Sequence, residues 1–136
     1  MRFRLLAFFV VLAALTSCSE NSSESSPDAG ELRVEQEFAG NAAYAEGSYS
    51  YVRIEEDDGD EVSEKRLDDV PRPTWTTHLE PGSYRLISYQ RPCAGDCSTL
   101  DPPTDRCEKL FHVARRGRIA AAIRVSPGEG CTIEFR

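Results

Sequence analysis

Residues 75–86 read WTTHLEPGSYRL, and this stretch decides the fold of the chain. Alternate side chains between residues 75 and 79 share one face of an extended segment, which is the pattern of a half-buried strand. Pro81 and Gly82 then turn the chain, because proline presets φ and we expect the glycine to take the left-handed position of a type II turn. A second strand follows at residues 83–91, so the stretch predicts strand, turn and strand.

Similar strands are expected on both sides of this unit. Asp58 and Gly59 separate two β-compatible runs and predict a hairpin, and Pro127 with Gly128 predicts another turn. Residues 119–123 read IAAAI and contain good helix formers, but Gly117 and Pro127 leave room for at most two turns, so a strand is favoured. The remaining expected strands lie at residues 31–38, 49–56, 61–67, 109–113, 119–125 and 131–135.

Seven or eight short strands with little helix indicate an all-β chain with a single β-sandwich. Residues 75–86 resemble the "aromatic, then Leu-x-Pro-Gly-x-Tyr-x-Leu" signature of carboxypeptidase-regulatory-like and transthyretin-like sandwiches. The resemblance covers about forty residues, together with the hairpin upstream. It implies an Ig-like or transthyretin-like sandwich, in a group whose members serve as adhesion repeats, carrier domains and accessory modules.

The N-terminus has the layout of a secretory signal peptide. Arg2 and Arg4 precede an apolar run at residues 5–15, which is shorter than the roughly 20 residues that a membrane-spanning helix needs. Residues 15–18 read LTSC and resemble the lipobox of bacterial lipoproteins, in which the cysteine is acylated and becomes the first residue. The resemblance implies an anchor on Cys18, membrane lipid as its partner, and a location on the extracytoplasmic face of the cell membrane.

The domain organisation follows from this reading. Residues 1–17 are expected to be the signal peptide, residues 18–30 the lipidated cysteine and a polar, flexible tether, and residues 31–136 the sandwich. A soluble secreted protein with an ordinary cleavage site is the alternative. The chain has five cysteines, and an odd number in a secreted protein needs an explanation, which acylation of Cys18 supplies.

Cys93, Cys97, Cys107 and Cys131 remain, and they predict two disulfides. Their spacing lacks the CxxC knuckles of zinc sites, and an oxidising compartment favours disulfide formation. Four cysteines allow three connectivities. The preferred pairing joins Cys97 to Cys107 and Cys93 to Cys131.

The loop between Cys93 and Cys107 is the candidate binding site, because cross-links and two prolines preorganise it. A purely structural loop is the alternative. The candidate binding residues are Asp96, Leu100, Asp101, Asp105 and Arg106. A binding module also predicts an aromatic patch beside the loop, built from Tyr49, Tyr51, Tyr84 or Tyr89.

Metal, cofactor and catalytic motifs are lacking. The acidic residues near positions 57–61 and in the cysteine loop lack the EF-hand order, and the sequence carries no phosphate loop, dinucleotide fingerprint or Gly-x-Ser-x-Gly elbow. His78 and His112 are expected on outward faces of their strands. An enzyme would instead need a pocket that brings one of them together with carboxylates.

The net charge of the chain limits the classes of partner that we expect it to bind. The net charge of −7 becomes −9 when Arg2 and Arg4 leave with the signal peptide, so nucleic acid is not expected to bind. The sequence therefore predicts a lipid-anchored, non-enzymatic binding or accessory module whose partner is an envelope protein or a glycan. The alternatives are a structural envelope module without a ligand, and a small hydrolase.

Overall fold

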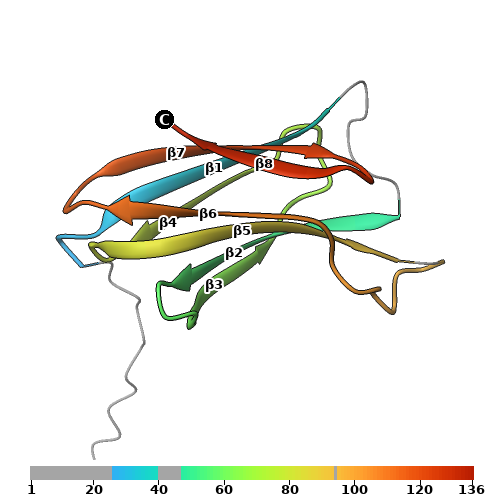
Figure 1. Ribbon diagram of the computed structural model, residues 1–136, viewed down its shortest axis with the longest axis horizontal. Helices are drawn as coiled ribbons and strands as arrows, with labels where there is room; N and C mark the ends of the chain where they lie inside the picture. Colours follow the sequence, from blue (N-terminus) through green and yellow to red (C-terminus); the bar gives the residue numbers. More distant parts are fainter. Residues whose placement is uncertain (1–25, 40–46, 94) are drawn as a thin grey trace, which may run out of the picture.

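The computed structural model describes residues 26–39, 47–93 and 95–136. The strands are β1 (Gly30–Phe38), β2 (Ser48–Glu56), β3 (Glu61–Arg66), β4 (Thr74–Leu79), β5 (Gly82–Pro92), β6 (Thr104–Val113), β7 (Arg118–Ser126) and β8 (Gly130–Phe135). Sheet A has the order β4-β1-β7-β8 and sheet B the order β3-β2-β5-β6. The two sheets form facing layers (Figure 1), which confirms the all-β sandwich. The expected signal peptide, Cys18 and residues 19–25 lie outside the described residues.

The core lies between the sheets and follows the period-two pattern. In β1, alternate side chains from Leu32 to Phe38 are buried, while Arg33 and Glu35 are exposed. β1 pairs antiparallel with β4 and parallel with β7, and β7 confirms the strand predicted for the alanine-rich segment. The buried apolar cluster comprises Leu32, Val34, Phe38, Val52, Ile54, Leu67, Leu79, Tyr84, Leu86, Phe111, Val113, Ala121, Ile123, Val125 and Ile133.

The turns agree with the sequence in two places and differ in one. Gly59 has φ +97° between β2 and β3, and Gly128 has φ +79° between β7 and β8, so both predicted turns are confirmed. The left-handed conformation predicted for Gly82 is wrong, because Gly82 has no positive φ and begins β5. Pro81 and Gly82 instead carry the chain from sheet A to sheet B.

The Tyr84 side chain closes this corner. Its hydroxyl donates a hydrogen bond to the Glu80 carbonyl oxygen at 2.9 Å, which links the first residues of β5 to the end of β4. A Cβ atom on Gly82 would lie 3.4 Å from the Tyr84 ring. At that distance a Cβ atom would make an ordinary van der Waals contact, so neither space nor an unusual backbone conformation requires glycine at this position.

Two linked side-chain hydrogen bonds cross the core between the sheets. The Gln36 amide nitrogen donates to the Ser50 hydroxyl at 2.8 Å, and that hydroxyl donates to the Gln90 side-chain oxygen at 2.8 Å. All three residues are buried. Because an unpaired buried polar group is costly, these bonds hold β1 of sheet A against β2 and β5 of sheet B.

Both disulfides form, but with a different connectivity from the preferred one. Cys93 is bonded to Cys97 and Cys107 to Cys131, so the pairing of Cys97 with Cys107 and of Cys93 with Cys131 is wrong. The reason is topological. Cys107 lies on β6 and Cys131 on β8, and these edge strands of the two sheets lie beside each other.

The strand β6 is also longer than expected. It begins at Thr104 rather than near residue 109, because Thr104 pairs with Gln90 across a register shift. The irregular part of the cysteine loop is shortened accordingly, and Asp105 to Cys107 belong to the sheet.

The two ends of the sandwich carry different features. Gly30 lies against Val113 and Gly117, and Gly82 pairs with Val113, so β1 starts at the Gly82 end of β5. The cysteine loop follows Pro92, at the other end of that strand. Ten residue steps at about 3.3 Å separate the two ends by roughly 33 Å. Figure 1 shows β1 starting at the left and the loop at the right.

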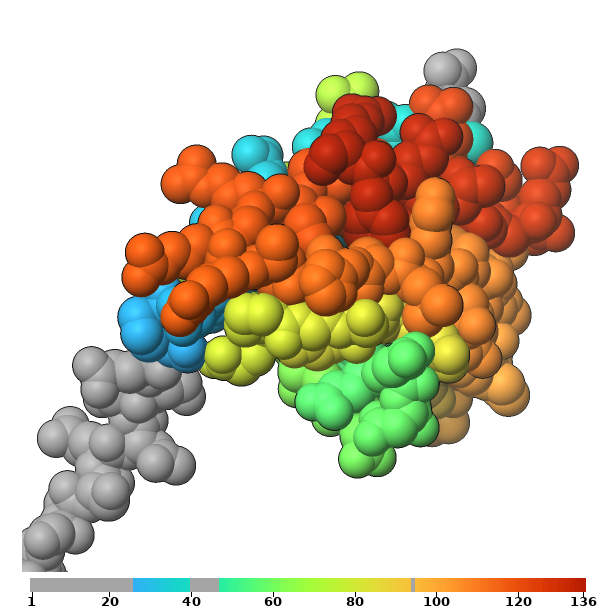
Figure 2. All heavy atoms as spheres, turned by 60° about the vertical axis from the view of Figure 1, so that its left-hand side comes forward, coloured from blue at the N-terminus to red at the C-terminus, as the bar shows by residue number. Residues whose placement is uncertain are grey.

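The residues just before β1 are bound to the Gly82 end. The Arg116 backbone amide donates to the Asp28 carbonyl at 3.0 Å, and its Nε donates to the Pro27 carbonyl at 3.0 Å. The Arg115 guanidinium forms an ion pair with the Asp28 carboxylate. In Figure 2 this blue segment lies directly on the orange turn that contains both arginines. Residues 27–29 thus belong to the folded domain.

We predict unequal costs for removing the two disulfides. Cys107 and Cys131 are 24 residues apart, and Cys93 and Cys97 are 4 apart, so the first bridge restricts the unfolded chain more. Cys107→Ala with Cys131→Ala should lower the free energy of unfolding by about 3 kcal/mol, and Cys93→Ala with Cys97→Ala by about 2 kcal/mol. Urea titration of each double variant measures both values, and a larger loss for the second variant would contradict this assignment.

Candidate functional site

The cysteine loop is a compact extension of the β5 end. The Cys93–Cys97 disulfide closes its first turn, and Cys93 forms a β-bridge with Leu100. The Asp101 amide donates to the Pro92 carbonyl at 2.8 Å. The loop therefore folds back on the strand that precedes it.

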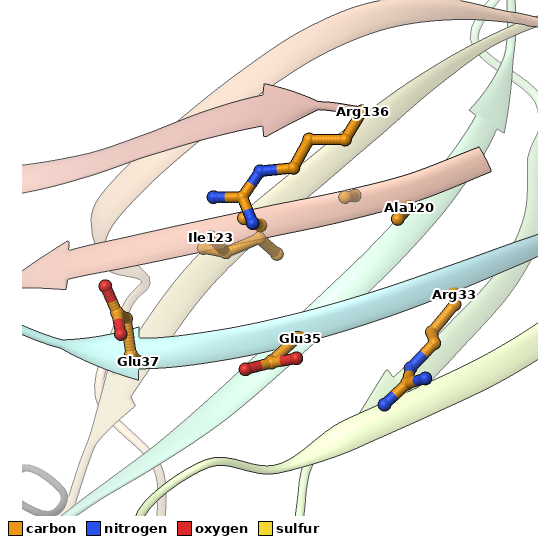
Figure 3. A pocket seen from close by; sticks show the side chains of 8 residues that line it. Arg33, Glu35, Glu37, Ala120, Ile123 and Arg136 are labelled. Carbon is orange, nitrogen blue, oxygen red and sulfur yellow. The ribbon is translucent and has the colours of Figure 1, made fainter.

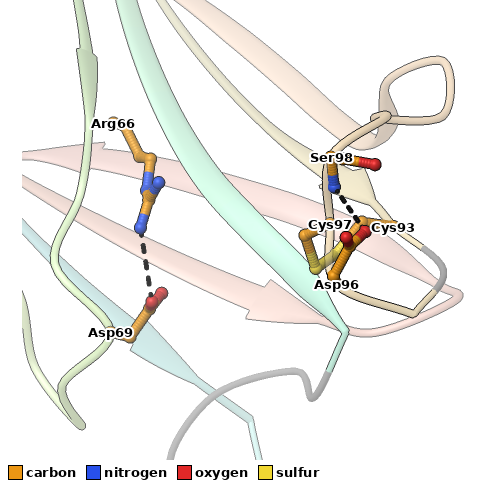
Figure 4. Close-up of a disulfide and its surroundings, with 6 residues drawn as sticks. All are labelled: Arg66, Asp69, Cys93, Asp96, Cys97 and Ser98. Atoms are coloured by element: carbon orange, nitrogen blue, oxygen red, sulfur yellow. Dashed lines mark hydrogen bonds and ion pairs between the residues drawn. A yellow bond between two sulfur atoms is a disulfide. The ribbon is translucent and has the colours of Figure 1, made fainter.

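Asp96 stabilises the turn inside the disulfide. Its carboxylate accepts a hydrogen bond from the Ser98 amide at 3.1 Å, drawn in Figure 4 beside the disulfide. This backbone hydrogen bond is the main reason why the pKa of the Asp96 carboxyl is lowered. The side chain is exposed, so its negative charge faces solvent from a fixed position.

Arg91 holds the second half of the loop. Its Nε donates to the Asp101 carbonyl at 3.1 Å, and Nη2 donates to the Leu100 carbonyl at 3.2 Å. Sequence reasoning did not single out Arg91. The alternation of β5 places it on the outer face of sheet B next to the loop, and that position is the signal that could have identified it.

Asp105 has a structural role. Its carboxylate accepts hydrogen bonds from the amides of Gly128 at 3.0 Å and Gly130 at 3.2 Å. It thereby joins the start of β6 to the β7–β8 turn. Neighbouring Arg106 points to Glu108, with an ion pair of 2.8 Å.

The structure does not bring the five candidate binding residues together. Asp96 stands in the disulfide turn, Leu100 and Asp101 lie against Arg91, Asp105 binds the β7–β8 turn, and Arg106 pairs along β6. Within residues 26–39, 47–93 and 95–136, no cluster of three or more metal-ligating side chains occurs. Asp96, Asp101 and Arg106 are exposed charged residues, and among them the Asp96 carboxylate accepts a backbone hydrogen bond from the disulfide turn.

Tyrosines lie beside the loop on the outer face of sheet B. Tyr49 pairs with Arg91, and Tyr51 with Tyr89. The Tyr51 and Tyr89 rings stack with centroids 5.4 Å apart, while the Arg66 guanidinium lies 3.7 Å from the Tyr49 ring centroid. We name these five residues the tyrosine face.

The tyrosine face matches the expected aromatic patch only in part. Tyr49 and Tyr51 are half-buried. Tyr89 is buried beside Tyr51, and its hydroxyl donates to the Glu64 carboxylate at 2.5 Å. Tyr84 is buried at the other end of β5, so it takes no part. Arg66 also pairs with Asp69 at 3.6 Å, as Figure 4 shows.

The two histidines are exposed, as predicted, and lie on different sheets. His78 is on β4 of sheet A, with its Nε2 3.9 Å from the Glu31 carboxylate. His112 is on β6 of sheet B, with its Nδ1 3.4 Å from the Ser83 hydroxyl. Neither side chain is buried.

None of the described segments forms a helix that is long and apolar enough to cross a bilayer.

The comparisons with known proteins identify no family for this chain. No protein-family model matches the chain, and no curated protein matches it. One match is a solved structure described as "Structure of Sugar Binding Protein Pneumolysin", at 19% identity and a TM-score of 0.32. It covers 79% of this chain but only 23% of that chain. At this TM-score the match carries no argument about fold or function.

We predict that Tyr89 makes stability sensitive to alkaline pH. Burial, with the hydrogen bond to Glu64 as the second cause, raises the pKa of Tyr89 to about 12, above the ordinary value of about 10. Protonated Tyr89 contributes fully to the free energy of unfolding below pH 10. This contribution is lost as the pH rises from 10 through 12, because over this range Tyr89 ionises readily only in the unfolded chain.

Urea midpoints measured between pH 9 and about 12 test this prediction. The midpoint of the unmodified protein should fall through the window, and Tyr89→Phe should flatten part of that fall. Tyr49→Phe serves as the control for a tyrosine of the same face. Equal slopes for all three proteins would contradict the assignment.

Proposed function

We propose that the chain is a lipid-anchored lipoprotein that presents a non-enzymatic binding module on the extracytoplasmic face of the membrane. The observation that carries the proposal is the use of the cysteines. Cys93, Cys97, Cys107 and Cys131 are consumed in two disulfides within the domain. Cys18 is the remaining cysteine, and it stands in the lipobox-like LTSC segment.

The arrangement of the domain supports display away from a membrane. The chain enters the sandwich at the Gly82 end, and the cysteine loop lies at the other end, roughly 33 Å away along β5. An anchor on Cys18 would therefore place the loop and the adjoining tyrosine face on the outward side. Tyrosine and arginine are side chains that binding surfaces favour, and tyrosine loses little conformational entropy because it has only two side-chain torsions.

A non-enzymatic role fits the same features. Each loop hydrogen bond that we describe fixes the backbone rather than orienting a nucleophile or a base, and the histidines lie on different sheets. A preorganised loop lowers the entropy cost of binding. The proposal includes the resemblance to carboxypeptidase-regulatory-like and transthyretin-like accessory modules, and it names an envelope protein or glycan as the partner class.

Substitution of Cys18 tests the anchor. Cys18→Ala should leave an uncut precursor, because lipoprotein processing requires the acylated cysteine, whereas the matched variant Ser19→Ala should be processed and remain with the membrane. Immunoblots of membrane and soluble fractions measure both outcomes. Normal cleavage of Cys18→Ala, with release of the product, would indicate the soluble secreted alternative.

Site-specific photo-crosslinking tests the binding surface. A benzophenone amino acid at exposed Thr99, in the cysteine loop, should give a discrete adduct in intact cells, because the loop end faces the partner. The same amino acid at exposed Asp57, in the turn at the opposite end, should not. Gel shifts with mass spectrometry identify the adducts. No adduct from Thr99 would favour the structural envelope module.

A further inference from the structure

β4 is an edge strand whose outer side is open in the described part of the chain. It stands at the end of sheet A and pairs with β1. Figure 3 looks onto the outer face of this sheet and shows β4 in yellow-green beside β1, on the side away from β7. Within residues 26–39, 47–93 and 95–136, no strand pairs with β4 on that side.

The register with β1 determines which backbone groups of β4 face outward. The Gln36 amide donates to the Pro73 carbonyl at 3.1 Å, so the odd-numbered residues from 73 to 79 direct their backbone groups towards β1. In an antiparallel ladder the alternate residues direct these groups to the other side. The amides and carbonyls of Thr74, Thr76 and His78 therefore form an open edge, which we name the β4 edge.

The other three edge strands are less open to a further strand. β6 and β8 are joined to each other by the Cys107–Cys131 disulfide. β3 reads EVSEKR, so most of its side chains are charged, and its ladder with β2 has a register shift; both features disfavour edge pairing. β4 reads TWTTHL, which lacks Lys, Arg, Asp and Glu and is rich in residues that favour strands. β4 is thus the described edge best suited to accept another strand.

Charged residues of opposite sign flank the β4 edge. Arg72 precedes the strand and Glu80 follows it. Glu80 also lines a surface hollow of about 580 Å³ together with Glu56, Asp57 and Asp58. A segment that pairs antiparallel with β4 begins at the Glu80 end and finishes at the Arg72 end. Positive charges at the start of such a segment therefore face these carboxylates.

We propose that the β4 edge accepts an extended segment of an envelope protein as an additional antiparallel strand, with basic residues at the start of that segment in the acidic hollow. Alternate residues of the segment exchange backbone hydrogen bonds with Thr74, Thr76 and His78. These bonds supply affinity, and the flanking charges set the direction in which the segment lies. The site is separate from the cysteine loop and from the tyrosine face, which belongs to sheet B.

A second copy of this chain fits the β4 edge less well. About a two-fold axis, two such edges join in antiparallel order, because a parallel pair would set each amide opposite the same amide of the other copy. The antiparallel pair has the Gly82 ends of its copies at opposite ends, so both copies could not stand on one membrane with their cysteine loops outward. This choice of occupant rests on the proposed anchor, whereas the open edge does not.

Titration with a synthetic peptide tests the proposal. The probe is the peptide KKTVTVT with blocked ends, and the sample is the protein purified from its host in detergent. Isothermal titration calorimetry should give a dissociation constant below about 1 mM. Trp75 is half-buried at the border of the core and is the sole tryptophan of the chain, so its emission should shift to shorter wavelength when a strand covers β4. The reversed peptide TVTVTKK should bind about tenfold more weakly, because its lysines lie near Arg72 instead of the acidic hollow.

Thr76→Pro and Thr76→Val are a matched pair of variants. Proline removes the outward amide of the β4 edge and leaves the hydrogen bonds to β1 in place, whereas valine keeps the amide and the preference for a strand. Thr76→Pro should weaken binding of KKTVTVT by about tenfold or more, and Thr76→Val should bind it as the unmodified protein does. Near-ultraviolet circular dichroism verifies that both variants are folded.

Three outcomes would overturn the proposal. The first is the absence of calorimetric binding up to about 1 mM peptide, and the second is equal affinity of the proline and valine variants. The third is a dimer in sedimentation equilibrium that Thr76→Pro abolishes, because the edge would then accept a second copy. None of these measurements depends on the lipid anchor, which the cleavage of Cys18→Ala tests separately.

Discussion

The Cys107–Cys131 disulfide is the constraint on which the closure of the sandwich depends. It joins β6 to β8, which are edge strands of different sheets. Around it, the Lys109 ammonium donates to the Ile133 carbonyl at 3.1 Å, and the Phe111 and Phe135 rings lie 5.2 Å apart. The core is thereby covered on this side without a continuous ladder. The other two edge strands, β3 and β4, have no such disulfide. Charged side chains along β3 disfavour its pairing with a further strand.

This bridge also determines how the cysteine loop is built. Because Cys131 is bonded to Cys107, no disulfide joins the two ends of the cysteine loop. Cys93 and Cys97 close only a small turn, and the rest of the loop depends on Arg91 and on Asp105. Order at this end of the sandwich thus comes from a guanidinium and a carboxylate that bind backbone groups. By sequence, Arg91 ends a predicted strand and Asp105 belongs to the loop, and their roles follow from where β5 ends and β6 begins.

Local sequence patterns predicted the strands and turns. The cysteine pairing and the contacts of buried polar side chains depend on the topology, which local patterns do not encode. Alternation located the strands, and Gly59 and Gly128 occupy the turns that their conformational freedom suggests. Cysteine pairing was missed because it depends on which strands become neighbouring edges, and no local pattern encodes the parallel pairing of β1 with β7. Gln36 illustrates the same limit. Its place in the inward row was visible, but its partners Ser50 and Gln90 lie on other strands.

The two outer faces of the sandwich use their charges differently. On sheet B, Arg53 lies within 3.7 Å of carboxylates on both β2 and β3, and Arg85 lies 3.9 Å from Glu55 and from Glu108. The guanidinium groups of Arg53 and Arg85 are therefore balanced by carboxylates within sheet B. On sheet A, Arg124 of β7 pairs with Glu37 of β1 at 2.6 Å, while Ala120 and Ala122 leave the neighbouring stretch of β7 without charged side chains.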